Sequence, residues 1–369
     1  MFKNKKIAAL LILIALVISA YIYSQKDIVT TYIGKTNVDS DIRTAILLNN
    51  GKVFITSITE NKACKTTESY FDPNTNKFTK INERNVCDGI DSITVLPNDN
   101  ILFAGGRRVN DALSTANIYN TKINKFIPTD NLKINRMGSQ AILISNDKVL
   151  ILGGIKTYSS QKFDYTEIYD IKSGTFHLSV KMPKNFESFG AELLRNNKVF
   201  ILGRIIPKDK YNFSYLTKPD SFILYDIKSK KFFPCGKMNV ARYGYSMTML
   251  NNGNLLIAGG DKKATAEIYD YKKNKFVMTG SMIESRRGHT ATLLRNGKIL
   301  ITGGAFGQAE MIDYRDTLEL YDPKTGKFSL AGKMREKQAH QTAILLKNNK
   351  VLILGGNYGN KILNTVELY

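Results

Sequence analysis

The stretch HTATLLRNGKILITGG, from His289 to Gly304, decides the fold of this chain. Its first half alternates apolar and polar residues, which is typical of a β-strand with one buried face. Asn296-Gly297 then suits a two-residue hairpin turn, because both residue types tolerate positive φ. A run rich in isoleucine and leucine follows and stops at two glycines. The stretch is therefore predicted to be a β-hairpin, whose strands are called a and b.

Turn signals of this kind recur along the chain, each between an alternating segment and a β-branched run. They are Asn50-Gly51, Asn98-Asp99, Asn146-Asp147, Asn196-Asn197, Asn252-Gly253, Asn296-Gly297 and Asn348-Asn349. After strand b, six units continue with a strand ending in an aromatic residue, a polar turn and a further strand, as in AEIYDYKKNKF. These strands are called c and d. A four-stranded meander of about 50 residues, repeated in this way, predicts a β-propeller.

The glycine doublet, the Tyr-Asp pair and the aromatic residue seven positions after the Tyr resemble the kelch repeat, and the resemblance extends from Thr30 to Tyr369. It implies a propeller of the kelch and galactose oxidase type. The doublet departs from the repeat at Ser57-Ile58 and Gly203-Arg204. Trp is absent, so its usual position is occupied by Phe78, Phe126, Phe176, Phe232, Phe276 and Phe328. The fold prediction stands, because Phe also fills the gap between blades.

The seventh unit contains strands a to c, so the ring needs a fourth strand to avoid an open sheet edge. In the six complete units, thirteen residues separate the d-strand Phe from the start of the next strand a, and the same spacing back from Arg43 reaches Thr30. We therefore expect residues 29–33 to pair with residues 366–369. The prediction is an all-β, seven-bladed propeller over residues 28–369, closed by an N-terminal strand.

Residues 1–25 are expected to be a signal peptide or an N-terminal membrane anchor helix. Three lysines precede an uncharged run, residues 7–24, that is long enough to border on a membrane span. Ile18-Ser19-Ala20 is a weak cleavage site, so cleavage and retention as a membrane tether both remain open. The lysines favour an N-terminus inside the cytoplasm. The propeller is thus expected outside it, as an exported protein that is periplasmic, at the cell surface or anchored to the inner membrane.

The chain is strongly basic, with a formal net charge of +21. Such a balance suits nucleic acid, an anionic surface or an acidic ligand. Export makes nucleic acid the least fitting of the three partners. We expect a monomer that binds a protein or an acidic glycan.

The position of the binding surface follows from loop lengths. From the doublet to the aromatic end of strand c the spacing varies between 9 and 21 residues, whereas the other spacings are nearly constant. Loops on a rigid scaffold commonly carry binding. The b-to-c and d-to-a connections share one face of a propeller, the loop face, and the a-to-b and c-to-d turns share the other, the turn face. Arginines concentrate on the loop face, and lysines crowd the turn face.

Arginine presents a planar fork that suits carboxylate or phosphate. The sequence therefore predicts that arginines line the central opening of the loop face, called the mouth. The arginines just ahead of strand a are expected nearest the axis. Alternatively, an arginine ahead of strand a belongs to the repeat and pairs with a neighbouring blade. Aromatic residues of the longest b-to-c loop either add to the surface or fold over their blade. The candidate binding residues are Arg107, Arg108, Arg136, Arg204, Arg242, Arg286, Arg287, Tyr211, Phe213 and Tyr215.

Catalysis is the less favoured function. The resemblance to galactose oxidase implies a copper site with two His, two Tyr and a Cys–Tyr crosslink. The chain has only His177, His289 and His340, which lack a convincing third ligand, so we expect no metal or other cofactor. Some exported kelch propellers are sialic acid mutarotases, which implies a sugar isomerase as the alternative function, although those enzymes are six-bladed. Its acid and base would come from Glu187, Asp91 and His289.

Cysteine is sparse. Cys64 precedes strand c and Cys87 follows strand d of the same blade. The two cysteines are therefore expected almost opposite each other across the hairpin of strands c and d. An exported compartment permits a Cys64–Cys87 disulfide. Cys235 would remain as a small buried residue.

Overall fold

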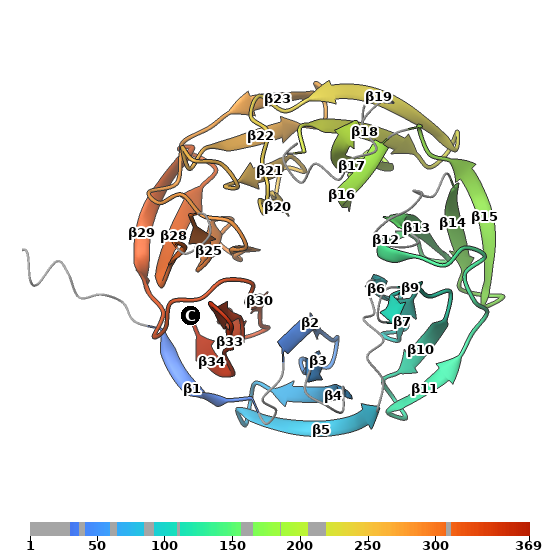
Figure 1. The fold of residues 1–369 in the computed structure, drawn as a ribbon, viewed down its shortest axis with the longest axis horizontal. Helices are drawn as coiled ribbons and strands as arrows, with labels where there is room; N and C mark the ends of the chain where they lie inside the picture. The colour runs from blue at the N-terminus through green and yellow to red at the C-terminus, as the bar shows by residue number, and fades with distance from the viewer. Residues whose placement is uncertain are drawn as a thin grey trace, which may run out of the picture.

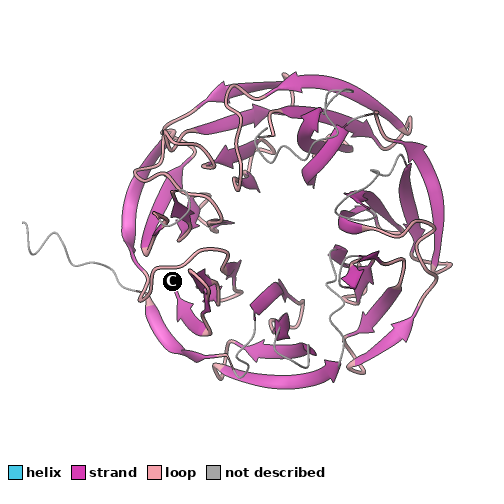
Figure 2. Ribbon diagram, viewed as in Figure 1, coloured by secondary structure: helices cyan, strands magenta, loops and turns pink. Residues whose placement is uncertain are grey.

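The computed structural model describes residues 30–36, 41–59, 65–84, 92–108, 111–155, 165–184, 186–205, 219–307 and 311–369. These residues form seven four-stranded antiparallel sheets, which stand as blades around a central axis (Figure 1). They contain strands, turns and loops but no helix (Figure 2), and so none that is long and apolar enough to cross a membrane. The all-β, seven-bladed prediction is confirmed. The expected signal or anchor segment, residues 1–25, lies outside the described residues.

Strands a and b of each blade lie nearest the axis and form the hairpin that the sequence predicts. The a strands are β2 (Asp41–Leu47), β6 (Ser92–Val95), β12 (Met137–Ser145), β16 (Phe186–Leu193), β20 (Ser246–Met249), β24 (Thr290–Leu293) and β30 (Thr342–Leu345). The b strands, which are almost wholly buried, are β3 (Val53–Thr59), β7 (Ile101–Ala104), β13 (Lys148–Ile155), β17 (Lys198–Ile205), β21 (Leu255–Ala258), β25 (Ile299–Thr302) and β31 (Val351–Leu354). Their β-branched and leucine-rich sequences suit a strand covered on both faces.

Strands c and d complete each blade towards the outside. The c strands are β4 (Lys65–Asp72), β10 (Ala116–Asn120), β14 (Tyr165–Asp170), β18 (Ser221–Asp226), β22 (Ala266–Asp270), β28 (Thr317–Asp322) and β34 (Thr365–Leu368). The d strands run along the rim of the ring (Figure 1) and are β5 (Lys77–Arg84), β11 (Lys125–Pro128), β15 (Thr175–Lys181), β19 (Lys231–Lys237), β23 (Lys275–Met278), β29 (Lys327–Lys333) and β1 (Thr31–Lys35). Blades are numbered 1 to 7 in the order of their a strands.

Short hairpins extend the b-to-c loops of three blades within the described residues. They are β8 (Arg107–Arg108) with β9 (Asp111–Ala112) in blade 2, β26 (Ala305–Phe306) with β27 (Asp313–Tyr314) in blade 6, and β32 (Asn357–Tyr358) with β33 (Lys361–Ile362) in blade 7. The variable loops of the sequence are therefore partly ordered projections of the loop face.

Six of the seven a-to-b turns differ from the predicted geometry, whereas in blade 3 Ser145 pairs with Lys148 across the two residues Asn146 and Asp147. In blade 6, Gly297 donates its N–H to Leu294 O at 2.9 Å, and Leu294 donates its own N–H to Lys298 O at 2.9 Å. Of the Asn296-Gly297 pair, only Gly297 has positive φ, at 83°. The connection is therefore a three-residue loop, a type I turn followed by one left-handed residue, rather than a two-residue turn.

The N-terminal strand closes the ring as the spacing predicts. Thr31 of β1 pairs with Leu368 of β34, and Lys35 pairs with Thr365, with a bulge before Gly34. Strand β1 begins two residues later than expected, but the pairing joins the same two segments. Figure 1 shows β1, in blue, beside β34, in red. Blade 7 thus takes its rim strand from the opposite end of the sequence.

Apolar clusters between neighbouring blades hold the ring together. Between blades 5 and 6, Leu256 and Ile301 belong to one such cluster, and Phe328 packs against it. The Phe328 ring also lies 4.7 Å from that of Tyr321, measured between centroids. A phenylalanine at the usual Trp position therefore fills the gap between blades, as the sequence suggests.

Candidate functional site

Three arginines that the sequence places at the mouth lie inside their blades instead. Their side chains have no exposed surface, and each pairs with a glutamate on strand c of the same blade. The contacts are Arg136 Nε–Glu167 Oε1 at 3.0 Å, Arg242 Nη2–Glu267 Oε1 at 2.9 Å and Arg286 Nη2–Glu319 Oε1 at 2.6 Å. These arginines therefore do not line the mouth. They belong to the repeat, although the paired glutamate is in the same blade rather than a neighbouring one.

The pair in blade 6 shows what such an arginine does. Arg286 Nη1 donates to Gly303 O at 2.7 Å and to Thr317 O at 3.0 Å, which ties the end of strand b to the start of strand c. Glu319 also accepts the N–H of Ile283, in the connection from blade 5, at 2.8 Å. Burial lowers the pKa of the Arg286 guanidinium, and the Glu319 carboxylate opposes this shift. The buried pair thus fixes the loops that it joins.

Other blades fill these positions differently. In blade 4 the arginine position is Phe186 and the glutamate position is Ile223, both buried. In blade 7 the glutamate remains as Glu367, but Gln338 replaces the arginine. The Glu367 carboxylate accepts the N–H of Arg335 at 3.0 Å and the hydroxyl proton of Thr30. An ion pair is therefore one of several ways to fill this part of a blade.

Four candidate arginines remain on the loop face. Arg108 is exposed and Arg107 half-buried, both on β8. Arg204 pairs with Glu187 at 2.6 Å, and its guanidinium lies 5.3 Å from the Phe189 ring centroid.

Arg287 is half-buried and donates to Gly307 O at 3.0 Å. Tyr211, Phe213 and Tyr215 lie outside the described residues, as do Cys64 and Cys87.

The structure reveals an apolar surface that the sequence analysis did not single out. The loop-face hairpins of blades 6 and 7 present Met311, 83% exposed, beside β27, and Tyr358, 52% exposed, on β32. The rings of Tyr314 and Tyr358 are 4.9 Å apart between centroids, so the two hairpins touch. Ile312 and Ile362 are also exposed. These five residues are called the hairpin patch. The long b-to-c spacing of blade 6 was its sequence signal.

More apolar side chains are exposed elsewhere on the loop face. They are Phe189, Ile205, Tyr243 and Ile283, which lie in or beside the connections of blades 3 to 6. Contiguous exposed apolar residues commonly mark a protein interface. The rim strands also expose Leu178, Phe233, Val277 and Leu330 to a similar extent, so the contact between the two hairpins is what distinguishes the hairpin patch. On the a-to-b and c-to-d turns that the structure describes, Ile123 is the large hydrophobic residue with comparable exposure. The two faces thus differ in apolar content as well as in charge.

Two of the three groups considered for acid–base catalysis are engaged or buried. His289 is buried, its Nε2 lies 2.9 Å from Ser246 Oγ, and burial lowers its pKa to about 3. Its imidazole is therefore neutral near pH 7. Glu187 pairs with Arg204, and Asp91 lies outside the described residues.

The histidines also do not assemble a metal site. His177 is on the rim strand β15, 2.9 Å from Thr175 Oγ1, whereas His289 points to the neighbouring blade. Within the described ranges, no group of three or more His, Cys, Asp or Glu side chains could hold a metal ion. Cys235 is half-buried on β19, and burial raises its pKa.

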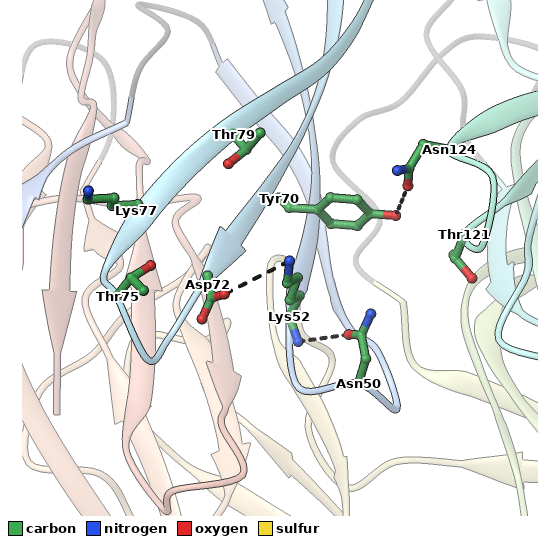
Figure 3. Close-up of a pocket in the computed structure, with 9 residues that line it drawn as sticks. All are labelled: Asn50, Lys52, Tyr70, Asp72, Thr75, Lys77, Thr79, Thr121 and Asn124. Atoms are coloured by element: carbon green, nitrogen blue, oxygen red, sulfur yellow. Dashed lines mark hydrogen bonds and ion pairs between the residues drawn. The ribbon is translucent and has the colours of Figure 1, made fainter.

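A polar cleft of about 360 Å³ lies on the turn face between blades 1 and 2 (Figure 3). Tyr70 Oη donates to Asn124 Oδ1 at 3.0 Å across it, and Lys52 Nζ lies 3.9 Å from Asp72 Oδ2. Figure 3 shows the cleft between these side chains and the nearby threonines. The residues around it are Asn50, Lys52, Tyr70, Asp72, Thr75, Lys77, Thr79, Thr121 and Asn124. It is therefore separate from the predicted mouth.

No family model matches this chain, and no curated protein matches it in sequence. Among solved structures, it is similar to a novel fungal alcohol oxidase of the AA5 family in complex with copper. The TM-score is 0.70 at 16% identity, over 92% of this chain and 76% of the oxidase chain. Similarity at this level of identity shows the shared propeller fold.

Proposed function

We propose that this protein is an exported or membrane-tethered kelch-type propeller that binds a protein partner through its loop face. The observation that carries the proposal is the apolar content of that face, above all the hairpin patch of Met311, Ile312, Tyr314, Tyr358 and Ile362. Aromatic residues and methionine are enriched in protein interfaces. The rigid ring presents these side chains without large ordering costs on binding.

The neighbouring charges give the expected partner its character. Arg287 lies close to the blade 6 hairpin, since it donates to Gly307 O. Arg107 and Arg108 project on the blade 2 hairpin. Arg287 thus lies beside the patch, and Arg107 and Arg108 lie two blades away from blade 7 on the same face. Together they favour a partner with acidic groups on the surface that it presents to this face. An acidic glycan is the second ligand to test, because the same arginines suit carboxylate groups.

The test measures partner capture by the full chain and by two matched variants. Met311→Ser with Tyr358→Ala removes the most exposed part of the hairpin patch. Ile123→Ser with Val277→Ser removes similarly exposed apolar residues from a turn and from a rim strand. We expect the first variant to lose at least about tenfold in affinity, because central aromatic anchors dominate binding energy. The second should bind as the wild type does.

Equal binding by both variants would contradict the proposal. Binding in a glycan array, lost on Arg108→Ala and Arg287→Ala, would identify a glycan partner instead. An anomer-exchange assay on any acidic sugar that binds would then test for the isomerase activity. Arg286→Ala is unsuitable for these experiments, because that side chain is buried in an ion pair.

A further inference from the structure

The turn face carries most of the excess positive charge of the chain. Its a-to-b turns (residues 48–52 in blade 1 and their equivalents) and its c-to-d turns (residues 72–77 and their equivalents) contain eighteen lysines and two arginines but only seven aspartates. Every blade contributes at least two of these cations. All of these cations are exposed except Lys198 and Lys298, which are half-buried. The face therefore has thirteen more cations than carboxylates, against a net charge of +21 for the whole chain.

The aspartates of these turns are largely engaged by the backbone. Asp170 accepts the N–H groups of Lys172 and Ser173, each at 3.0 Å, and Asp322 accepts that of Lys324 at 2.9 Å. These backbone hydrogen bonds lower the pKa of both carboxyl groups. The ion pairs that they make with lysine are exposed and long, such as Lys273 Nζ–Asp270 Oδ2 at 3.7 Å. The carboxylates thus shape the turns and leave most lysines available to a partner.

Several cations of the loop face are paired with carboxylates, although Lys184, Lys262, Lys263 and Lys361 are exposed there. The three buried arginines are paired with glutamates, and Arg204 is paired with Glu187. Arg315 contacts Asp313 and lies 3.8 Å from Glu284. The excess of thirteen cations in the turns is therefore the larger concentration of positive charge that the described residues show.

The form of the turn face favours a planar partner. Figure 1 looks along the shortest axis of the molecule, so the a-to-b turns lie on one of its two broad sides. The c-to-d turns lie towards the rim, where Gly326 O accepts the N–H of Gly280, in the connection from blade 5, at 2.9 Å. Its cations come from all seven blades and encircle the axis instead of following one groove. Proteins that bind single-stranded nucleic acid combine a basic groove with stacking aromatic residues. The turns described here expose Ile123 and polar groups but no large stacking surface.

The described chain enters the ring at its rim, where Thr30 donates its N–H to Lys333 O, at the end of β29, at 3.1 Å. Strand β34 ends beside the a-to-b turn of blade 7, because Tyr369 donates to Val351 O at 2.9 Å. Thr31 begins β1 opposite Leu368, so the chain joins the rim where a c-to-d turn would lie. Residues 25–29 separate this point from the apolar run of residues 7–24. Five residues span at most about 18 Å, so an apolar segment inserted in a bilayer would keep this part of the rim near it.

We propose that the turn face docks on the surface of an anionic phospholipid bilayer. Lysine suits this role, because its hydrated ammonium is attracted to a charged surface without needing a fitted site. The cleft between blades 1 and 2 opens on the same face and offers Lys52 and Lys77 to a headgroup phosphate. The docked ring holds its loop face, with the hairpin patch, away from the bilayer and towards a partner.

The experiment compares binding of the full chain to phosphatidylcholine vesicles with and without about one third phosphatidylglycerol. The turn-face variant carries Lys228→Gln, Lys231→Gln, Lys275→Gln and Lys324→Gln. Its matched control carries Lys184→Gln, Lys262→Gln, Lys263→Gln and Lys361→Gln, all exposed on the loop face. Both variants lower the net charge by the same amount. We expect at least a tenfold preference of the wild type for anionic vesicles, weakened by salt, retained by the control and largely lost by the turn-face variant.

A second measurement covers the case in which residues 7–24 bind every vesicle. Acetylation of lysines, read by mass spectrometry, should be suppressed by anionic vesicles at Lys228 and Lys324 but not at Lys262 and Lys263. Equal protection on both faces, equal loss in both variants, or no preference for anionic lipid would overturn the proposal. Binding to soluble polyphosphate without recruitment to vesicles would overturn it in favour of a soluble polyanion. The turn-face variant should keep its affinity for the loop-face partner, so the two proposals fail separately.

Discussion

Removing one partner from a buried arginine–glutamate pair should weaken the propeller far more than removing a surface ion pair. Glu319→Ala leaves the Arg286 guanidinium, with no exposed surface, with the half-buried Glu284 carboxylate at 3.1 Å as its remaining negative partner, beside the carbonyl groups of Gly303 and Thr317. It also removes the acceptor of the Ile283 N–H. An uncompensated buried charge costs about 3–5 kcal/mol, and an orphaned amide about 1 kcal/mol. The partial rescue by Glu284 places the total near 3–5 kcal/mol.

Blade 4 supplies the matched rescue. Arg286→Phe with Glu319→Ile copies Phe186 and Ile223, which fill the same positions there. Replacing both charges with apolar residues is often close to neutral, so this double variant should recover at least half of the loss. Urea unfolding followed by tyrosine fluorescence measures both, with a fall of about 1 M in midpoint expected for Glu319→Ala.

The control for this prediction is Lys273→Ala, which removes the exposed pair with Asp270 and should cost less than about 1 kcal/mol. The reasoning is refuted if Glu319→Ala costs no more than this control. It is also refuted if the double variant is less stable than Glu319→Ala alone.

Three further predictions concern the blades. His289, with a folded pKa of about 3 against about 6.5 when unfolded, binds its proton only after unfolding, so stability should fall by about 1.4 kcal/mol per pH unit as the pH drops from 6.5 towards 3. Thermal unfolding between pH 7 and 4 should show a shallower loss for His289→Gln, and identical slopes would contradict this. Gly259→Ala should lower the free energy of unfolding by more than about 3 kcal/mol, because φ is 73° and the new Cβ would lie 2.7 Å from Arg286 O. Gly138→Ala, at φ 68° in open space, should lower it by about 1–2 kcal/mol. Similar losses of the two variants in urea unfolding would contradict the packing argument. Peptide mapping without reduction should find Cys64 joined to Cys87 by a disulfide, and free thiols at both residues would contradict this prediction.

The sequence predicted the fold because the unit is repeated. Each turn signal, such as Asn296-Gly297, is weak alone, but seven copies in register define blades, and their fixed spacing locates the closing strand near Thr30. The two-residue turn was wrong for six blades, since Asn-Gly also suits the three-residue loop that they contain, and it holds in blade 3. Repetition determines architecture more firmly than the local geometry of any one turn.

The arginines were misplaced because their position in the repeat does not reveal the direction of the side chain. A within-chain signal existed: Glu167, Glu267 and Glu319 each lie two residues before the c-strand Tyr, in the blades that have the arginine. Blade 4 lacks both members of the pair. Pairing each arginine with this glutamate would have predicted a buried ion pair.

The hairpin patch had only a length signal. Strands of two residues, such as β27 and β32, are too short to show any periodicity. The contact between Tyr314 and Tyr358 joins two blades, and sequence spacing within one blade carries no information on it. Such surfaces depend on tertiary placement.

The central claim is a closed ring whose loops and turns are thereby sorted onto two faces, and amide hydrogen exchange of the wild-type chain tests it most directly. Peptides covering Thr31–Lys35 and Thr365–Leu368 should be protected as strongly as the equivalent strands of blade 6, Lys327–Lys333 and Thr317–Asp322, because β1 and β34 pair in the same way. Exchange of both blade 7 peptides within seconds, while blade 6 remains protected, would show that the N-terminal strand does not close the ring.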